Sequence, residues 1–172
     1  MSQPLVPPPG EKITLADFDP RDHNCVAGKK EGKEELAANR KRLRELSYRL
    51  WAEDQRSALL VLQGMDTAGK DGTIRHVMKG VNPQMCQVTA FKQPSSEELD
   101  HDFLWRIHRA LPRRGTIGIF NRSHYEDVLV VRVRKLAPEH VWRRRYEMIN
   151  HFEQLLTTGT TTIIKIFLHI SK

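Results

Sequence analysis

Residues 64–73 read G-M-D-T-A-G-K-D-G-T, and residues 57–63 before them form the short apolar run S-A-L-L-V-L-Q. Gly64, Gly69 and Lys70 match the phosphate-loop pattern G-x-x-x-x-G-K, which needs a buried strand before it and a helix after it. The apolar run is too short for an independent helix and is typical of a strand buried on both faces. Backbone N–H groups in such a loop, together with the N-terminus of the following helix, bind phosphate. The stretch therefore predicts a P-loop α/β fold; the alternative is a strand-to-helix turn that carries a surface lysine.

The loop and the first turns of the next helix form the predicted phosphate site. Its members are Gly64, Thr67, Ala68, Gly69, Lys70, Asp71, Gly72, Thr73 and Arg75. We expect Lys70 to be exposed, so that its ammonium group can supply charge to the phosphoryl group in transfer.

Two acidic residues set this loop apart from the common pattern. Asp71 stands where most P-loop proteins place a Ser or Thr that holds Mg²⁺, and Asp66 lies within the loop itself. Carboxylates beside bound phosphate repel it unless a cation lies between them, and they suit Mg²⁺ as hard oxygen ligands. We therefore predict that carboxylates hold the metal. For Asp71 the alternative of an acid stabilised by the helix dipole stays open.

Outward from the loop, apolar runs alternate with stretches of helical periodicity. We predict further strands at residues 86–91, 116–120 and 161–169, and helices at residues 34–53, 73–79, 97–111, 124–133 and 138–156. Strands that alternate with helices indicate a parallel sheet covered on both faces, a three-layer α/β/α fold. Residues 1–30 are rich in Pro and Gly and lack periodicity, which predicts an extended arm before a core of residues 31–172.

A second motif, F-N-R-S-H-Y-E-D-V-L, begins at the end of the third predicted strand. Ligands of open parallel sheets gather at the carboxyl ends of the strands, so Asn121 and Arg122 should lie beside the phosphate loop. Arg122 can hold phosphate in bidentate fashion. Glu126 and Asp127, in the first turn of the next predicted helix, are placed to complete a metal site with Asp66.

These motifs, with the intervening A-F-K-Q-P-S and D-F-L-W-R-I-H-R-A-L-P segments, resemble the family-2 polyphosphate kinases over nearly the whole chain after the arm. The resemblance implies a thymidylate-kinase-like fold, a homo-oligomer, and Mg²⁺-dependent transfer of phosphate between inorganic polyphosphate and nucleotides, with Mn²⁺ as an alternative ion. It implies that Asp66, Lys70, Arg122 and Asp127 are catalytic, and that Asp66 and Asp127 hold the metal. Many family members carry aspartate at the position of Asn121. The N-R-S-H-Y-E-D form is similar to the subgroup that accepts both AMP and ADP.

The resemblance also indicates where the substrates bind. Kinases of this fold hold the acceptor nucleotide after the second strand and on the next helix, and to this site we assign Phe91, Lys92, Arg106, Asn121 and Glu126. Core packing is the alternative role for Phe91. Four basic residues predict a track for polyphosphate, each with a solvated surface charge as the alternative: Arg75, Lys79, Arg132 and Arg134.

The composition is basic and limits the other function classes. Lys and Arg number 28 against 21 Asp and Glu, a formal charge of +7, which favours polyanionic ligands. The rivals are an ATP-dependent nucleoside monophosphate kinase and a basic nucleic-acid-binding protein without catalysis. Aromatic residues make up only 7% and no nucleic-acid-binding module is visible, so we predict no nucleic-acid partner.

The remaining sequence features concern location and extent. The chain shows no signal peptide and no apolar stretch of about 18 residues, which predicts a cytoplasmic protein without a membrane partner. Cys25 and Cys86 lie far apart without C-x-x-C spacing, and we predict free thiols. Members of the family continue past the fourth strand into an arginine-rich lid. We therefore expect a C-terminal portion of roughly a hundred residues to be missing here. This chain alone should be inactive or nearly so and prone to associate, whereas the extended, full-length protein should be soluble and active.

Overall fold

The computed structural model describes residues 6–7, 10–22 and 26–171. Within this part of the chain the strands form a parallel sheet in the order β2-β3-β1-β4. Their bounds are β1 Ser57–Gly64, β2 Cys86–Ala90, β3 Ile117–Asn121 and β4 Thr161–Leu168. Each predicted strand is confirmed to within one residue at either end.

The central strand β1 carries the phosphate loop at its carboxyl end. It pairs with β4 along its whole length, from Ser57↔Thr161 to Gly64↔Leu168, and with β3 on its other side. Leu59 is fully buried in this strand. A strand with a neighbour on each side and helices on both faces must be apolar throughout, which explains the unbroken hydrophobic run in the sequence.

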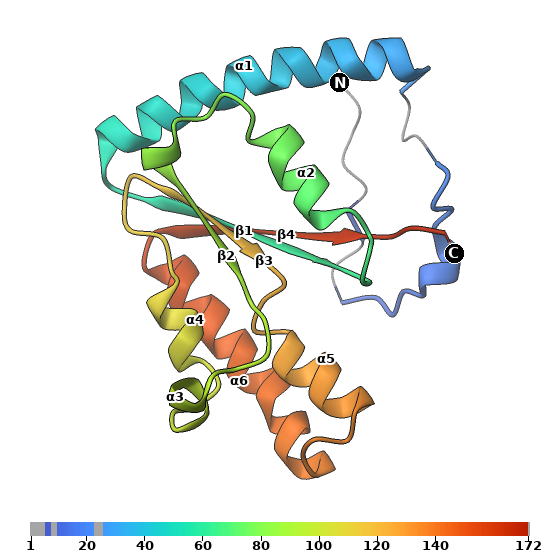
Figure 1. Cartoon of the computed structure of the whole chain (residues 1–172), viewed down its shortest axis with the longest axis vertical. Coiled ribbons are helices and arrows are strands. Elements are labelled where there is room, and N and C mark those ends of the chain that lie inside the picture. Colours follow the sequence, from blue (N-terminus) through green and yellow to red (C-terminus); the bar gives the residue numbers. More distant parts are fainter. Residues whose placement is uncertain (1–5, 8–9, 23–25, 172) are drawn as a thin grey trace.

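Figure 1 shows helices on both faces of the sheet. One face carries α1 (Lys29–Glu53) and α2 (Lys70–Val77). The opposite face carries α4 (Trp105–Arg109), α5 (Glu126–Val133) and α6 (Glu139–Thr158), with the short α3 (Ser96–Leu99) leading into α4. The single turns η1 (Leu15–Asp17) and η2 (Pro83–Met85) precede α1 and β2. The predicted three-layer α/β/α fold is confirmed.

The main core lies between the sheet and the helices α4 and α6. Phe120 of β3 is fully buried and meets Phe91 edge-on, with ring centroids 4.8 Å apart and an interplanar angle of 84°. Ile107 of α4 and Phe152 of α6 belong to the same buried cluster. Burial of each such side chain contributes about 1.5–3 kcal/mol relative to exposure. This packing fixes the end of β3, from which the second sequence motif continues.

The predicted continuous helix over residues 97–111 is wrong. The chain forms α3 and α4 instead, separated by residues 100–104. Asp102 Oδ1 accepts the backbone N–H of Leu104 at 2.9 Å, and the ring of His101 stacks on Trp105 with centroids 4.0 Å apart. A side-chain acceptor that captures a backbone donor competes with helical hydrogen bonding. The spacing of the apolar residues does not reveal this competition.

The helix starts also differ from the predictions. The helix after the loop begins at Lys70 rather than at residue 73, because the left-handed Gly69 takes the N-cap position. Pro138 stands at the N-cap of α6, one residue before the first helical position.

Two further predictions concern the thiols and the membrane. Cys86 is a free thiol, and burial raises its pKa; Cys25 lies outside the described residues. Among the helices of the described residues, none has the length and apolar character needed to cross a bilayer.

Candidate active site

The phosphate loop joins the end of β1 to the start of α2. Gly69 has a φ of 83° and Thr67 a φ of 66°, and the N–H of Thr73 bonds the Gly69 carbonyl at 2.8 Å. Gly64 is needed for space, since a Cβ there would meet the carbonyl oxygen of Leu168 in β4 at 3.0 Å. The loop therefore ends at the N-terminus of α2, whose unpaired backbone N–H groups attract anions.

A cleft of about 630 Å³ opens beside this loop. Its wall comes from the loop and the start of α2, from the end of β2 with the segment after it, and from the end of β3. The lining residues are Asp66, Thr67, Ala68, Gly69, Lys70, Asp71, Gly72, Ala90, Phe91, Lys92, Gln93, Asn121 and Arg122. Most of the predicted phosphate residues thus share one cleft with Asn121 and Arg122, as expected where the carboxyl ends of parallel strands meet.

Gln93 lines the cleft although the sequence analysis did not select it. It follows directly on the predicted acceptor residues in the A-F-K-Q-P-S segment. Its position directly after the second strand is the same signal that assigned Lys92 to the acceptor site.

The expectation that Lys70 is exposed is wrong. The residue is only 8% exposed, and its Nζ donates to the carbonyl oxygens of Gly64 at 2.9 Å and Met65 at 2.8 Å. The ammonium group is therefore held against the loop's own backbone. In this position it offers the cleft a charge that is already oriented and largely removed from water.

Two side-chain pairs connect the end of β3 to the loop. Arg122 Nη2 forms an ion pair with Asp66 Oδ1, and Asn121 Nδ2 donates to Asp71 Oδ1 at 2.5 Å. Arg122 has a φ of 63°, an uncommon conformation for a residue other than glycine. The Asp66 side chain is 82% exposed, so solvent screens its ion pair. An incoming phosphate can therefore replace Asp66 as the ion-pair partner of Arg122 at a modest cost in free energy.

Asp127 is not among the residues that line the cleft and lies between two arginines instead. Its carboxylate is 3.3 Å from Arg106 Nη2 and 4.0 Å from Arg145 Nη1, and only 13% of the side chain is exposed. Burial raises the pKa of Asp127, against the lowering effect of both guanidinium groups. Asp66 pairs with Arg122, whereas Asp127 pairs with Arg106 and Arg145. The structure brings the two carboxylates into no direct contact. A metal shared by the two carboxylates stays a prediction.

Arg106 connects this arginine cluster to the predicted acceptor site. Its Nη1 donates to the carbonyl of Lys92 at 2.9 Å, and its guanidinium group lies 5.5 Å from the ring centroid of Phe91. Phe91 is buried against Phe120, which confirms its packing role; it also lines the cleft, and its contact with a nucleotide stays a prediction.

The other predicted residues lie outside the lining of the cleft. Glu126 accepts a hydrogen bond from Gln63 Nε2 at 3.3 Å, while Thr73 lies one turn into α2. The four basic residues of the predicted polyphosphate track are all exposed, but they come from α2 and α5 or from the residues just after them: Arg75, Lys79, Arg132 and Arg134. Because these helices cover opposite faces of the sheet, the structure does not gather the four side chains into one row (Figure 1).

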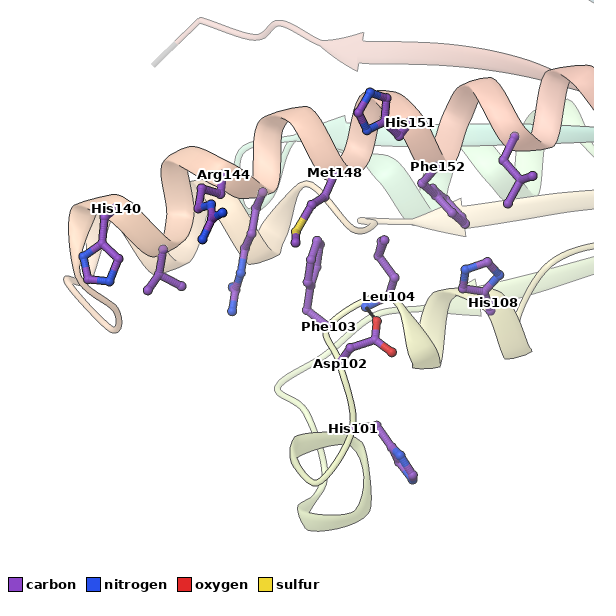
Figure 2. Close-up of a pocket in the computed structure, with 13 residues that line it drawn as sticks. His101, Asp102, Phe103, Leu104, His108, His140, Arg144, Met148, His151 and Phe152 are labelled. Atoms are coloured by element: carbon purple, nitrogen blue, oxygen red, sulfur yellow. Dashed lines mark hydrogen bonds between the residues drawn. The ribbon is translucent and has the colours of Figure 1, made fainter.

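A second groove, of about 990 Å³, lies between α6 and the segment that joins α3 to α4. Figure 2 shows Phe103 and Leu104 directed toward Met148 and Phe152 of α6. The groove is lined by no residue of the phosphate loop. Although several histidines border it, the described residues contain no cluster of three or more His, Cys, Asp or Glu arranged to hold a metal. The cleft at the phosphate loop is therefore the candidate active site.

Comparisons with known proteins identify the family to which the chain belongs. Residues 26–172 match the sequence model of the family described as Polyphosphate kinase 2. The chain is 51% identical over 165 residues to an AMP/ADP-polyphosphate phosphotransferase of Meiothermus ruber, and 46% identical over 175 residues to an ADP-polyphosphate phosphotransferase of Rhodopseudomonas palustris. The crystal structure of Polyphosphate Kinase 2 from Arthrobacter aurescens TC1 superposes with a TM-score of 0.90 at 47% identity.

These matches extend over most of this chain but not over most of the relatives. The two sequence relatives are matched over 95% of this chain and over 62% and 61% of their own lengths. The crystal structure is matched over 94% of this chain and 59% of its own. The chain therefore spans about three fifths of the length of these relatives.

Proposed function

Because this chain belongs to the polyphosphate kinase 2 family, we propose that the protein transfers phosphate between inorganic polyphosphate and the adenine nucleotides AMP and ADP. One observation carries the proposal. Lys70, the backbone of the phosphate loop, and Arg122 line a single cleft from two neighbouring strands. That arrangement supplies several positive groups to one phosphate chain, which is what phosphoryl transfer requires of a protein.

The proposed reaction needs no covalent intermediate on the protein. The protein holds donor and acceptor in position for direct transfer. An oxygen of the acceptor's phosphate attacks the terminal phosphorus of polyphosphate, and the bond from that phosphorus to the rest of the chain breaks. Loop N–H groups hold the donor's phosphates at the N-terminus of α2. Lys70 neutralises charge on the transferring group, and Arg122 fixes its orientation in bidentate fashion.

The carboxylates at the cleft suit Mg²⁺, which the proposed reaction requires. Mg²⁺ binds through one or two protein carboxylates together with water and substrate phosphates, so a small donor set is sufficient. Asp66 is exposed at the mouth of the cleft and Asp71 lies beside it, so we assign Asp66 as the main ligand. Asp127 remains the proposed second ligand and must leave Arg106 to act as one. When bound, Mg²⁺ neutralises phosphate charge; Mn²⁺ is the alternative ion.

The acceptor nucleotide is proposed to bind along the segment after β2. Phe91, Lys92 and Gln93 line the cleft, and Arg106 donates to the backbone carbonyl of Lys92. A lysine and an amide at this point can bind the acceptor's phosphate and a polar edge of its base or sugar.

Three further properties are proposed from the family and the charge. They are a homo-oligomeric assembly, a cytoplasmic location with its pools of AMP and ADP, and a basic surface that guides polyphosphate to the cleft. The four exposed basic residues of α2, α5 and their ends are the candidates for that surface.

The decisive test is a conversion assay with purified full-length protein and each donor in turn. Polyphosphate with AMP or ADP should give ADP or ATP in the presence of Mg²⁺, whereas ATP as donor to AMP should be much slower. Faster transfer from ATP would favour the nucleoside monophosphate kinase. Absence of any transfer together with tight RNA binding would favour the nucleic-acid-binding alternative.

A further inference from the structure

A largely buried carboxylate on α6 contacts the second sequence motif from outside the cleft. Glu153 is 13% exposed and accepts the hydroxyl of Tyr125 at 2.5 Å. His124 Nε2 lies 3.3 Å from the same oxygen, and Lys165 Nζ of β4 lies 2.7 Å from the other. One side chain thus connects α6, β4 and the turn between β3 and α5. None of these contacts belongs to the phosphate site described above.

The carboxylate of Glu153 is ionised at neutral pH. Burial alone would raise its pKa, but the bonds from His124, Lys165 and Tyr125 together lower it to about 2. Burial and the neighbouring carboxylate raise the pKa of Tyr125 well above its usual range, so its hydroxyl stays a donor. A buried charge that loses its partners is strongly unfavourable, and these contacts therefore resist displacement.

His124 is oriented by this carboxylate. Its side chain is fully buried, and its Nδ1 has no hydrogen-bond partner among the described residues. A proton on Nε2 is needed for the bond to Glu153, so this bond is the one that orients the ring. The position of His124 consequently depends on Glu153.

The turn that these contacts hold is the one that presents Arg122. Arg122 has a left-handed backbone, with its N–H bonded to the Leu62 carbonyl at 3.0 Å, and Ser123 after it is fully buried. A residue in such a sparsely populated conformation stays there only when its surroundings over-determine it. His124 and Tyr125 follow within three residues, and both are fixed by Glu153.

We propose that Glu153 is a positioning residue for the phosphate site, which keeps the turn after β3 in the conformation that directs Arg122 into the cleft. The inference rests on the proposed function for the role of Arg122, but not for the contacts themselves. A role in stability alone would predict that loss of Glu153 weakens the fold without any link to Arg122. The two possibilities separate in a double-mutant cycle.

The cycle uses full-length protein with Glu153→Gln, Arg122→Ala and both changes, with Glu147→Gln on the exposed side of α6 as the matched control. Calorimetry measures the affinity for tripolyphosphate, and the conversion assay measures kcat and KM. Glu153→Gln should weaken tripolyphosphate binding about tenfold when Arg122 is present and less than about twofold when it is absent, because coupled neighbours are not additive. The Glu147→Gln control should have the same tripolyphosphate affinity, kcat and KM as the unsubstituted protein.

Additive losses in the cycle would overturn the inference, as would unchanged tripolyphosphate affinity in a folded Glu153→Gln variant. If that variant fails to fold, Tyr125→Phe takes its place, since it removes the 2.5 Å bond and leaves the charge. A non-additive cycle in a protein that converts no nucleotide would support the inference and reject the proposed function. Failure of the unsubstituted protein to bind tripolyphosphate would reject both.

Discussion

Replacement of Lys70 by alanine tests the catalytic role proposed for this residue separately from its structural role. The side chain makes two hydrogen bonds to loop carbonyls, and bonds from a charged donor contribute about 1.5–3 kcal/mol each. Lys70 itself lines an open cleft, so water can take the place of its ammonium group beside the freed carbonyls, and we expect a net loss of only about 1–2 kcal/mol. For a domain of this size that is a fall in Tm of about 2–8 °C. Loss of a group that stabilises charge in the transition state typically lowers kcat by about 10²–10³-fold.

The test compares thermal unfolding with the conversion of AMP and ADP by polyphosphate in Lys70→Ala. Lys41→Ala is the matched control, because Lys41 is exposed on α1. We expect a folded variant with a small decrease in Tm and a loss of at least a hundredfold in turnover, roughly the effect of one transition-state donor. Turnover within a few-fold of the unsubstituted protein would refute the argument. So would a loss of activity that is explained entirely by unfolding at the assay temperature.

Four further predictions follow from the site, the charge and the fold. Asp127→Asn should raise the Mg²⁺ concentration for half-maximal turnover much more than Asp71→Asn; the reverse order would move the second ligand to Asp71. Tripolyphosphate affinity should fall more steeply with salt than AMP affinity, because the longer anion meets more cations; equal slopes in calorimetry would argue against a basic track. Gly118→Ala should lower the unfolding free energy by about 1–3 kcal/mol, because its Cβ would meet the Pro112 ring at 2.8 Å; chemical denaturation measures this. The pKa of Glu153 in the folded protein, about 2, lies below its ordinary value of 4.5. The ionised carboxylate therefore stabilises the fold fully above pH 4.5, and the free energy of unfolding should fall by on the order of 3 kcal/mol as the pH drops to 2. A Glu153→Gln variant should lack this part of the pH dependence.

The strands and the phosphate loop are predictable from the sequence because local constraints define them. An apolar run as short as that of β1 has few alternatives to a buried strand, and Gly64 and Gly69 mark positions where backbone space or a positive φ is needed. The phosphate loop and Arg122 lie close together because both follow the carboxyl ends of parallel strands, where ligands of such sheets gather.

Features that depend on which partner a single side chain binds in the folded chain were not predictable. The break at Asp102 arises from a local capture of a backbone donor that periodicity ignores. The burial of Lys70 depends on carbonyls presented by the folded loop, and the arginines beside Asp127 come from α4 and α6. Glu153 gave no sequence signal, since a glutamate on an amphipathic helix is usually a solvated charge.

The pairing of β1 with β4 has a consequence for how the protein is made. Ser57 and Thr161, the first residue pair between these strands, are 104 residues apart in the chain. One edge of the central strand therefore stays unpaired until β4 has been synthesised. At about 5–20 residues per second, that interval lasts about 5–20 s on the ribosome. During it this apolar strand has no strand on that edge, and its other edge is paired only after β3 has been made. Nascent chains should therefore depend on chaperones in this interval, and slow codons between β3 and β4 should increase aggregation during synthesis.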